Sequence, residues 1–134
     1  MARILVKRLK FDPIVRSFSK SQAFKRAARR ATNSQFNKAK NNLIQKFDSH
    51  PVTREIEGGV GASNSSGTLG GYGNLYTFIG FYKEENPIDI VRSAIRQYTT
   101  ISKGKFTANR NRAEANFIIK APTTEELASV TPMP

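Results

Sequence analysis

Apolar residues recur at intervals of three and four along a stretch that starts at Ser17 or Ser21 and ends near Phe47. This period predicts one long amphipathic helix, with a slip of one residue between Thr32 and Gln35. The stripe is narrow and rich in alanine, so we expect it to pack closely against a helix or a sheet rather than to fill a large core. Its members are Phe24, Ala27, Ala28, Ala31, Phe36, Ala39, Leu43, Ile44 and Phe47.

Two shorter helices are predicted further along the chain. Asn86 is a preferred N-cap residue, Pro87 suits the first helical position, and Asp89 lies near the positive end of the helix dipole. Thr123 and Glu126 have the spacing of a capping box, which predicts a short helix that ends at about Val130. The apolar face of the first of these helices consists of Ile88, Val91, Ile95 and Tyr98.

Three other segments have the character of strands. Residues 75–81 are apolar and aromatic, and residues 103–108 and 114–121 are joined by a polar turn with two arginines. Residues 2–11 are either a short strand or an extended arm, because Asp12-Pro13 ends the pattern. The expected core places Phe78, Ile79 and Phe81 against Ile88, Val91 and Ile95.

A glycine- and serine-rich loop precedes residues 75–81, and seven of the nine glycines lie between Gly58 and Gly73. Loops of this length are usually functional or become ordered against another chain. The segment is therefore either a surface loop without a role or a docking arm, and we favour the docking arm. The candidate residues for contact between subunits or with a partner are Gly58, Gly59, Gly70, Gly71 and Tyr72.

These elements predict an α+β protein with a long N-terminal basic helix, a glycine-rich loop and a small antiparallel sheet with one packed helix. We expect a basic arm and helix over residues 1–50 and a small body over residues 51–134, with the extended loop at 58–74. Hydrophobic residues make up 38% of the 134 residues, which is enough for a small core only. We therefore expect neighbouring subunits to complete the fold and to order the loop.

The net charge of +12 is concentrated at one end, because residues 1–47 have thirteen Lys and Arg against the single acid Asp12. A basic helix face is either a solvated face or a binding face for nucleic acid, an acidic protein or an anionic membrane. The alanine-rich stripe argues against the membrane. The candidates for contact between subunits or with a partner are Lys25, Arg26, Arg29 and Arg30, and those for contact with DNA or an acidic surface are Lys38 and Lys40.

Residues with catalytic or metal-binding chemistry are sparse. The chain has no cysteine, and the single histidine, His50, precedes Pro51 and is expected to form a turn or a cap. Glu55 and Glu57 would face the same way only on a strand, so an acid/base pair is not expected. No phosphate-binding loop or nucleophile elbow is present. We predict a protein without enzymatic activity, cofactor or metal, and the N-terminal residues contain no apolar run long enough for a signal peptide or a membrane span.

Five segments carry a family resemblance: FDSHPVTREIEGG, ASNSSGTLGGYGNL, YTFIGF, NPID and APTTEELASVTPMP. Over residues 47–134 the chain resembles small virion structural proteins of contractile-tailed bacteriophages, and more widely their minor tail or tail-completion proteins. The resemblance implies a noncatalytic subunit of the tail, neck or baseplate, made in the host cytoplasm. The implied partners are other virion proteins, further copies in a six-fold or multiple ring, and packaged DNA, with no membrane. Such relatives continue past the TPMP segment. Independently of the resemblance, nothing charged or polar seals this end, so we expect either a fragment or last residues that lie against a neighbour.

The competing interpretation is a basic nucleic-acid-binding protein associated with the ribosome or the nucleoid. Clustered Lys and Arg neutralise phosphates without regard to sequence. Zinc-finger ligands and the aromatic motif of ribonucleoprotein domains are absent from the sequence, which weakens this interpretation. A protein that lies on a membrane surface is the third class.

Overall fold

The computed structural model describes residues 2–9, 17, 20–109 and 112–130. It confirms the predicted α+β class with a long basic helix and a small antiparallel sheet. The chain divides into two compact units. We call residues 1–40 and 99–121 the sheet unit, and residues 41–98 and 122–134 the helical unit. The sequence led us to expect a division into residues 1–50 and 51–134.

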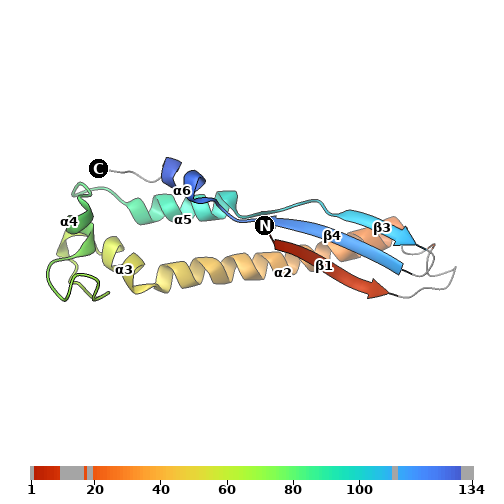
Figure 1. Cartoon of the computed structure of the whole chain (residues 1–134), viewed down its shortest axis with the longest axis horizontal. Coiled ribbons are helices and arrows are strands. Elements are labelled where there is room, and N and C mark those ends of the chain that lie inside the picture. Colours follow the sequence, from red (N-terminus) through yellow and green to blue (C-terminus); the bar gives the residue numbers. More distant parts are fainter. Residues whose placement is uncertain (1, 10–16, 18–19, 110–111, 131–134) are drawn as a thin grey trace. The chain divides into compact units, whose positions relative to one another are not determined.

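The sheet unit is built around the long strand β4 (Arg112–Lys120). Strand β1 (Ala2–Leu9) pairs antiparallel with one edge of β4, so the N-terminal segment is a strand and not an extended arm. Strands β2 (Thr100–Ile101) and β3 (Lys105–Asn109) also pair antiparallel with β4. Because Ile119 pairs with both Ala2 and Ile101, β2 occupies the edge opposite β1. Figure 1 shows β1 and β3 on either side of β4.

Strands β2 and β3 pair with the same edge of β4, and the residues between them interrupt the ladder of strand hydrogen bonds. Ser102 donates its N–H to the carbonyl of Ile118 (2.9 Å), and its hydroxyl oxygen accepts the N–H of Ile118 (2.8 Å). Gly104 then takes a left-handed φ of +82°, and a Cβ at this position would lie 2.6 Å from the ring of Phe117. Phe117 is 1% exposed and meets Phe106 edge to face, with ring centroids 6.0 Å apart. Glycine at this position therefore lets the buried ring fill the bend.

Helix α2 (Gln22–Ser49) starts after Ser21, the second of the two predicted starts, and Ser21 Oγ accepts the N–H of Phe24 (3.2 Å). Its buried positions follow a spacing of four, with Thr32 and Phe36 in the sheet unit and Ile44 in the helical unit. Thr32 rather than Ala31 is buried, Ala27 and Ala39 are exposed, and Leu43 is 42% exposed. The predicted stripe was therefore wrong at these positions. The stripe passes through polar residues that the apolar pattern did not include.

The helical unit contains α3 (Pro51–Glu57), a 3₁₀ turn (Gly59–Gly61), α4 (Leu75–Ile79), α5 (Pro87–Tyr98) and α6 (Thr124–Val130). Figure 1 shows α6 lying along α5. Local capping signals were read correctly at three of these helices. His50 Nδ1 accepts the N–H of Val52 (3.3 Å) ahead of α3. Asn86 Oδ1 accepts the N–H of Asp89 (3.3 Å), and Thr123 and Glu126 form the predicted capping box.

The predicted strand over residues 75–81 is wrong, because Leu75–Ile79 forms α4. Asn74 Oδ1 accepts the N–H of Thr77 (2.9 Å) as the N-cap, and Gly80 ends the helix with a left-handed φ of 92°. A cap at each end stabilises one and a half turns of helix despite the aromatic and β-branched residues between them. The helix changes the side-chain period, so Tyr76 becomes 2% exposed and Phe78 72% exposed.

The core of the helical unit therefore differs from the expected one. Ile88 and Ile95 of α5 are buried as predicted, whereas Phe78 and Ile79 are exposed and Val91 and Phe81 are half-buried. Tyr76 replaces them at the centre: its ring lies 5.4 Å from that of Phe81, and its hydroxyl donates to the carbonyls of Tyr82 and Glu85. The other buried apolar residues among those described in the unit are Ile44, Leu75, Pro87 and Ala94.

Candidate functional site

The glycine- and serine-rich loop is supported from inside the helical unit by Glu55 of α3. Glu55 is only 1% exposed. Its Oε1 accepts the N–H of Leu75 (2.8 Å), and its Oε2 accepts the N–H of Ser66 (2.9 Å). The amide nitrogen of Asn64 donates to both oxygens, at 2.9 and 3.2 Å. One carboxylate thus accepts hydrogen bonds from Asn64 and Ser66 in the middle of the loop and from Leu75 directly after its end.

Asn64 extends this support to the tip of the loop. While its amide nitrogen donates to Glu55, its Oδ1 accepts the N–H groups of Leu69 and Gly71, each at 3.0 Å. Asn74 adds a further link by donating to the carbonyl of Val60 (3.1 Å). The loop therefore obtains its hydrogen bonds from its own unit. This corrects our expectation that a neighbouring chain is needed to order it.

The electrostatics of Glu55 follow from its burial and its donors. Burial raises the pKa of Glu55, but the donors from Asn64, Ser66 and Leu75 outweigh burial and lower the pKa to about 2. The carboxylate is therefore ionised at neutral pH, and the groups that donate to it are all neutral. Glu55 and Glu57 lie on a helix, which removes the strand geometry that an acid/base pair of these two residues required.

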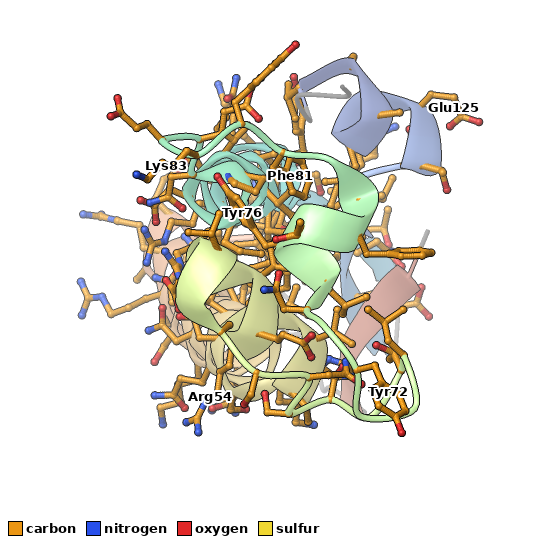
Figure 2. The ribbon with its side chains drawn as sticks, turned by 90° about the vertical axis from the view of Figure 1, so that its left-hand side faces the viewer. Arg54, Tyr72, Tyr76, Phe81, Lys83 and Glu125 are labelled. Carbon is orange, nitrogen blue, oxygen red and sulfur yellow. The ribbon has the colours of Figure 1, made fainter. Side chains whose placement is uncertain are left out.

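The supported loop presents Tyr72 at the surface of the helical unit. Tyr72 is 84% exposed, and Figure 2 shows it at the rim of the unit, pointing away from the helices. Gly71 and Gly73 on either side have left-handed φ values of 88° and 67°, which a larger residue would adopt only with strain. Two more aromatic side chains of the same unit are mostly exposed, so we define the exposed aromatics as Tyr72, Phe78 and Tyr82.

Arg92 of α5 ties together three segments of the helical unit. Its Nε donates to Asp48 (2.7 Å), one terminal nitrogen donates to Glu57 (2.8 Å), and the other pairs with Asp89. The carboxylates of Glu57 and Asp48 raise the pKa of the guanidinium further above its usual range. These contacts hold the C-terminal end of α2 and the helices α3 and α5 to one another.

Charge separates strongly between the two units. The sequence of the sheet unit has 17 Lys and Arg against two acids, whereas that of the helical unit has five against eight. The excess of positive charge is therefore not confined to the N-terminal segment, because Lys103 and the basic residues of β3 and β4 belong to the same unit. An excess of this size on one unit creates a field that attracts polyanions.

A cavity of about 330 Å³ lies in the sheet unit between α2 and the segment that follows β2. Arg29 is held at this cavity by two contacts: its Nε donates to the carbonyl of Lys103 (3.2 Å), and its guanidinium carbon lies 5.1 Å from the centre of the Phe106 ring. The residues that line the cavity are Arg29, Asn33, Ile101, Ser102, Lys103 and Phe117. We call this cavity the basic cavity.

The basic residues proposed from the sequence all lie on α2 in the sheet unit. Lys25 joins Arg29 at the Phe106 ring, with its Nζ 6.0 Å from the ring centre. Arg26 donates to the carbonyl of Gln22 (3.4 Å) within its own helix, while Arg30 and Lys38 are exposed. Lys40 is half-buried and donates to the carbonyl of Thr99 (2.9 Å).

The proposed glycines and Tyr72 lie in the helical unit, so the structure assigns the two predicted clusters to different units. Gly58 caps α3 by donating its N–H to the carbonyl of Arg54 (3.0 Å). Gly59 starts the 3₁₀ turn, and Gly70 and Gly71 form the tip with Tyr72. These glycines shape the backbone, and Tyr72 is the residue among them with a side chain to present.

Sequence reasoning missed Glu55, Asn64, Arg92, Phe106 and Lys103. The local sequence around Glu55 contains nothing that predicts burial, because its partners lie 9 to 20 residues away. Arg92 is separated from Asp48 by 44 residues, and Arg29 from Lys103 by 74. A pattern of local spacing cannot detect pairs of this kind.

Comparison with protein-family models, with curated proteins and with solved structures gives no match. Among the described residues, no helix is both long and apolar enough to cross a membrane. Within the same residues, no three His, Asp or Glu side chains are grouped so as to hold a metal ion.

Proposed function

We propose that this protein is a noncatalytic structural subunit of a contractile-tailed phage virion, located in the tail, neck or baseplate. It assembles as a ring and joins neighbouring virion proteins. The proposal rests on the resemblance of residues 47–134 to such proteins and on the display of Tyr72 by an internally supported loop. Among these observations, the exposure of Tyr72 on that loop carries the proposal.

An exposed aromatic side chain on a supported loop suits protein–protein recognition. Tyr72, Phe78 and Tyr82 are each more than 70% exposed, although aromatic side chains gain most from burial. Tyrosine is also enriched at the centres of interfaces. Since Asn64 already fixes the backbone beside Tyr72, little loop entropy is lost when a partner binds. The loop therefore favours a docking role that needs no rearrangement.

The proposed assembly is tested by sedimentation velocity over a wide range of protein concentration. We expect the wild type to form a closed oligomer as concentration rises, and the variant Tyr72→Ser/Phe78→Ser to remain largely monomeric. Leu43→Ser/Ile90→Ser is the matched control, because both residues are partly exposed in the same unit but belong to α2 and α5. A wild type that is monomeric at every concentration, or a control that dissociates equally, contradicts the proposal.

The position in the particle is tested by solving an intact virion that contains the chain. We expect several symmetry-related copies with Tyr72 buried against a neighbour. Copies that leave Tyr72 in solvent throughout would argue against the docking role of the loop.

The nucleic-acid-binding alternative is favoured by one observation, the 17 Lys and Arg against two acids in the sheet unit. The oligomeric state distinguishes a virion subunit from a nucleic-acid-binding protein. A protein that stays monomeric while it binds random duplex DNA with a steep dependence on salt supports the alternative.

A further inference from the structure

We propose that the basic cavity binds the phosphate groups of a nucleic acid backbone. The cavity lies entirely in the sheet unit, so this inference stands independently of the docking role of the helical unit. Its volume of about 330 Å³ is in the lower part of the range of ligand pockets, about 300 to 1,000 Å³. It is therefore large enough for a phosphate group with part of its sugar.

The polar lining of the cavity consists of groups that can donate hydrogen bonds. Arg29 and Lys103 supply cationic donors, and Asn33, one helical turn from Arg29, supplies an amide. Ser102 accepts a hydrogen bond from the N–H of Ile118, which leaves its own hydrogen for a ligand. Among the described residues no carboxylate lines the cavity. This set of donors matches the oxygens of a phosphodiester.

Arg29 is preorganised for an anion. Its Nε is engaged by the carbonyl of Lys103 (3.2 Å), and the ring of Phe106 supports the guanidinium from one side at 5.1 Å. In the described part of the chain no carboxylate pairs with Arg29, so its two terminal nitrogens remain available as a fork. Such a fork binds two oxygens of one phosphate at once.

Neither Phe117, which lines the cavity, nor Phe106, which contacts Arg29, offers a platform for bases. Phe117 is 1% exposed, and Phe106 is half-buried with Lys25 and Arg29 placed against its ring. Stacking of bases needs an open aromatic face. The site therefore recognises the backbone, and we expect no preference for base sequence.

Charge density favours nucleic acid over an acidic protein as the ligand. Duplex DNA carries one negative charge for about every 1.7 Å of its axis, whereas carboxylates on protein surfaces are separated and mostly interspersed with cations. Exposed ion pairs between proteins contribute little, but each phosphate contact releases condensed counterions. The 17 Lys and Arg of the sheet unit are matched best by such a polyanion.

The test is fluorescence anisotropy with the full chain and a labelled random-sequence duplex, titrated over a range of salt. We expect Arg29→Ala/Lys103→Ala to bind about tenfold more weakly and to lose about 1.8 from the slope of log K against log salt, because two phosphate contacts are removed. Arg30→Ala/Lys38→Ala removes the same charge from exposed positions of α2 outside the cavity. This variant should lose less affinity and less of the salt slope. Arg54→Ala/Lys83→Ala removes two positive charges from the helical unit and should bind the duplex as the wild type does.

Arg29→Lys keeps the charge and guards against a folding defect in the double variant. It should retain the salt slope but bind about fivefold more weakly, because an ammonium has no planar fork. Wild type that does not bind the duplex overturns the proposal, as do equal losses for the cavity pair and the Arg30/Lys38 pair. Tighter binding to poly-glutamate, with the same dependence on Arg29 and Lys103, would overturn it in favour of an acidic protein. These binding measurements do not depend on ring assembly, which is tested separately through Tyr72 and Phe78.

Discussion

The carboxylate of Glu55 and the amide of Asn64 form a buried pair, with Asn64 Nδ2 at 2.9 and 3.2 Å from the two carboxylate oxygens. Asn64 is fixed in orientation by this pair, so its carbonyl oxygen faces the N–H groups of Leu69 and Gly71. A glycine- and serine-rich segment, which has little apolar surface to bury, is thereby given a defined conformation by hydrogen bonds. The exposed Tyr72 depends on this relationship for its position.

Replacing Asn64 by alanine should loosen the loop without unfolding the protein. The N–H groups of Leu69 and Gly71 lose their acceptor, and Glu55 loses one donor. We expect amide hydrogen exchange at Leu69 and Gly71 to become at least about tenfold faster, while exchange in α5 changes little. Ser63→Ala, at an exposed loop position, is the control and should leave both rates unchanged. Unchanged exchange at Leu69 and Gly71 in Asn64→Ala would show that the loop is held by other contacts.

The stability of the protein should depend on pH through Glu55. Its pKa is lowered from 4.5 to about 2 in the folded state, so the unfolded chain binds more protons between these values. The stabilisation is fully present above about pH 4.5 and is lost as the pH falls toward 2. Urea unfolding from pH 6 to pH 2 should show this loss in the wild type, and Glu55→Gln should show a flatter profile. Glu84→Gln, at an exposed position, should follow the wild type; a Glu55→Gln profile as steep as that of the wild type would contradict the assignment.

Replacing Arg92 by alanine should destabilise the helical unit. The change removes a guanidinium whose side chain is 16% exposed and leaves Asp48, Glu57 and Asp89 close together without their shared cation. We expect a loss of about 1 to 2 kcal/mol in the free energy of unfolding, measured by urea denaturation. Arg92→Lys should recover only part of it, because three carboxylates are held by different nitrogens of the fork. Arg54→Ala, at an exposed position of α3, is the control, and an equal effect there would mean that the ion pairs contribute nothing of their own.

The sequence was most informative where structure is decided by neighbouring residues. The helix that starts at Pro87, the capping box of Thr123 and the capping role of His50 all depend on contacts within three residues, and the structure confirms each of them. The antiparallel pair formed by β3 and β4 also agrees with prediction, because the two strands are close neighbours in the sequence. These elements needed no information from distant parts of the chain.

The errors arose where local propensity and distant contacts disagree. Residues 75–81 have the composition of a strand, but Asn74 and Gly80 cap a helix between them, and this reversed the burial expected for Phe78. The support of the loop could not be predicted because Glu55 reaches Leu75 across 20 residues. The basic cavity was missed for the same reason, since its α2 residues and Lys103 are brought together only by folding of the sheet unit.

Replacing Gly104 by alanine should destabilise the sheet unit, because two independent constraints favour glycine at this position. The backbone has a φ of +82°, and an added Cβ would lie 2.6 to 3.0 Å from three atoms of the Phe117 ring, which is buried and cannot move aside freely. We expect a loss of about 2 kcal/mol or more in the free energy of unfolding, measured by urea denaturation.

Gly61→Ala is the matched control for this change, because nothing lies within 4 Å of its added Cβ and its φ is not left-handed. The two variants add the same methyl group, so the difference between them reports the contact with Phe117 and the left-handed backbone rather than chain entropy alone. Gly104→Ala should also weaken the binding of duplex DNA, since Gly104 follows Lys103 and precedes β3. A variant at Gly104 as stable as that at Gly61 would mean that the bend between β2 and β3 is free to take another conformation.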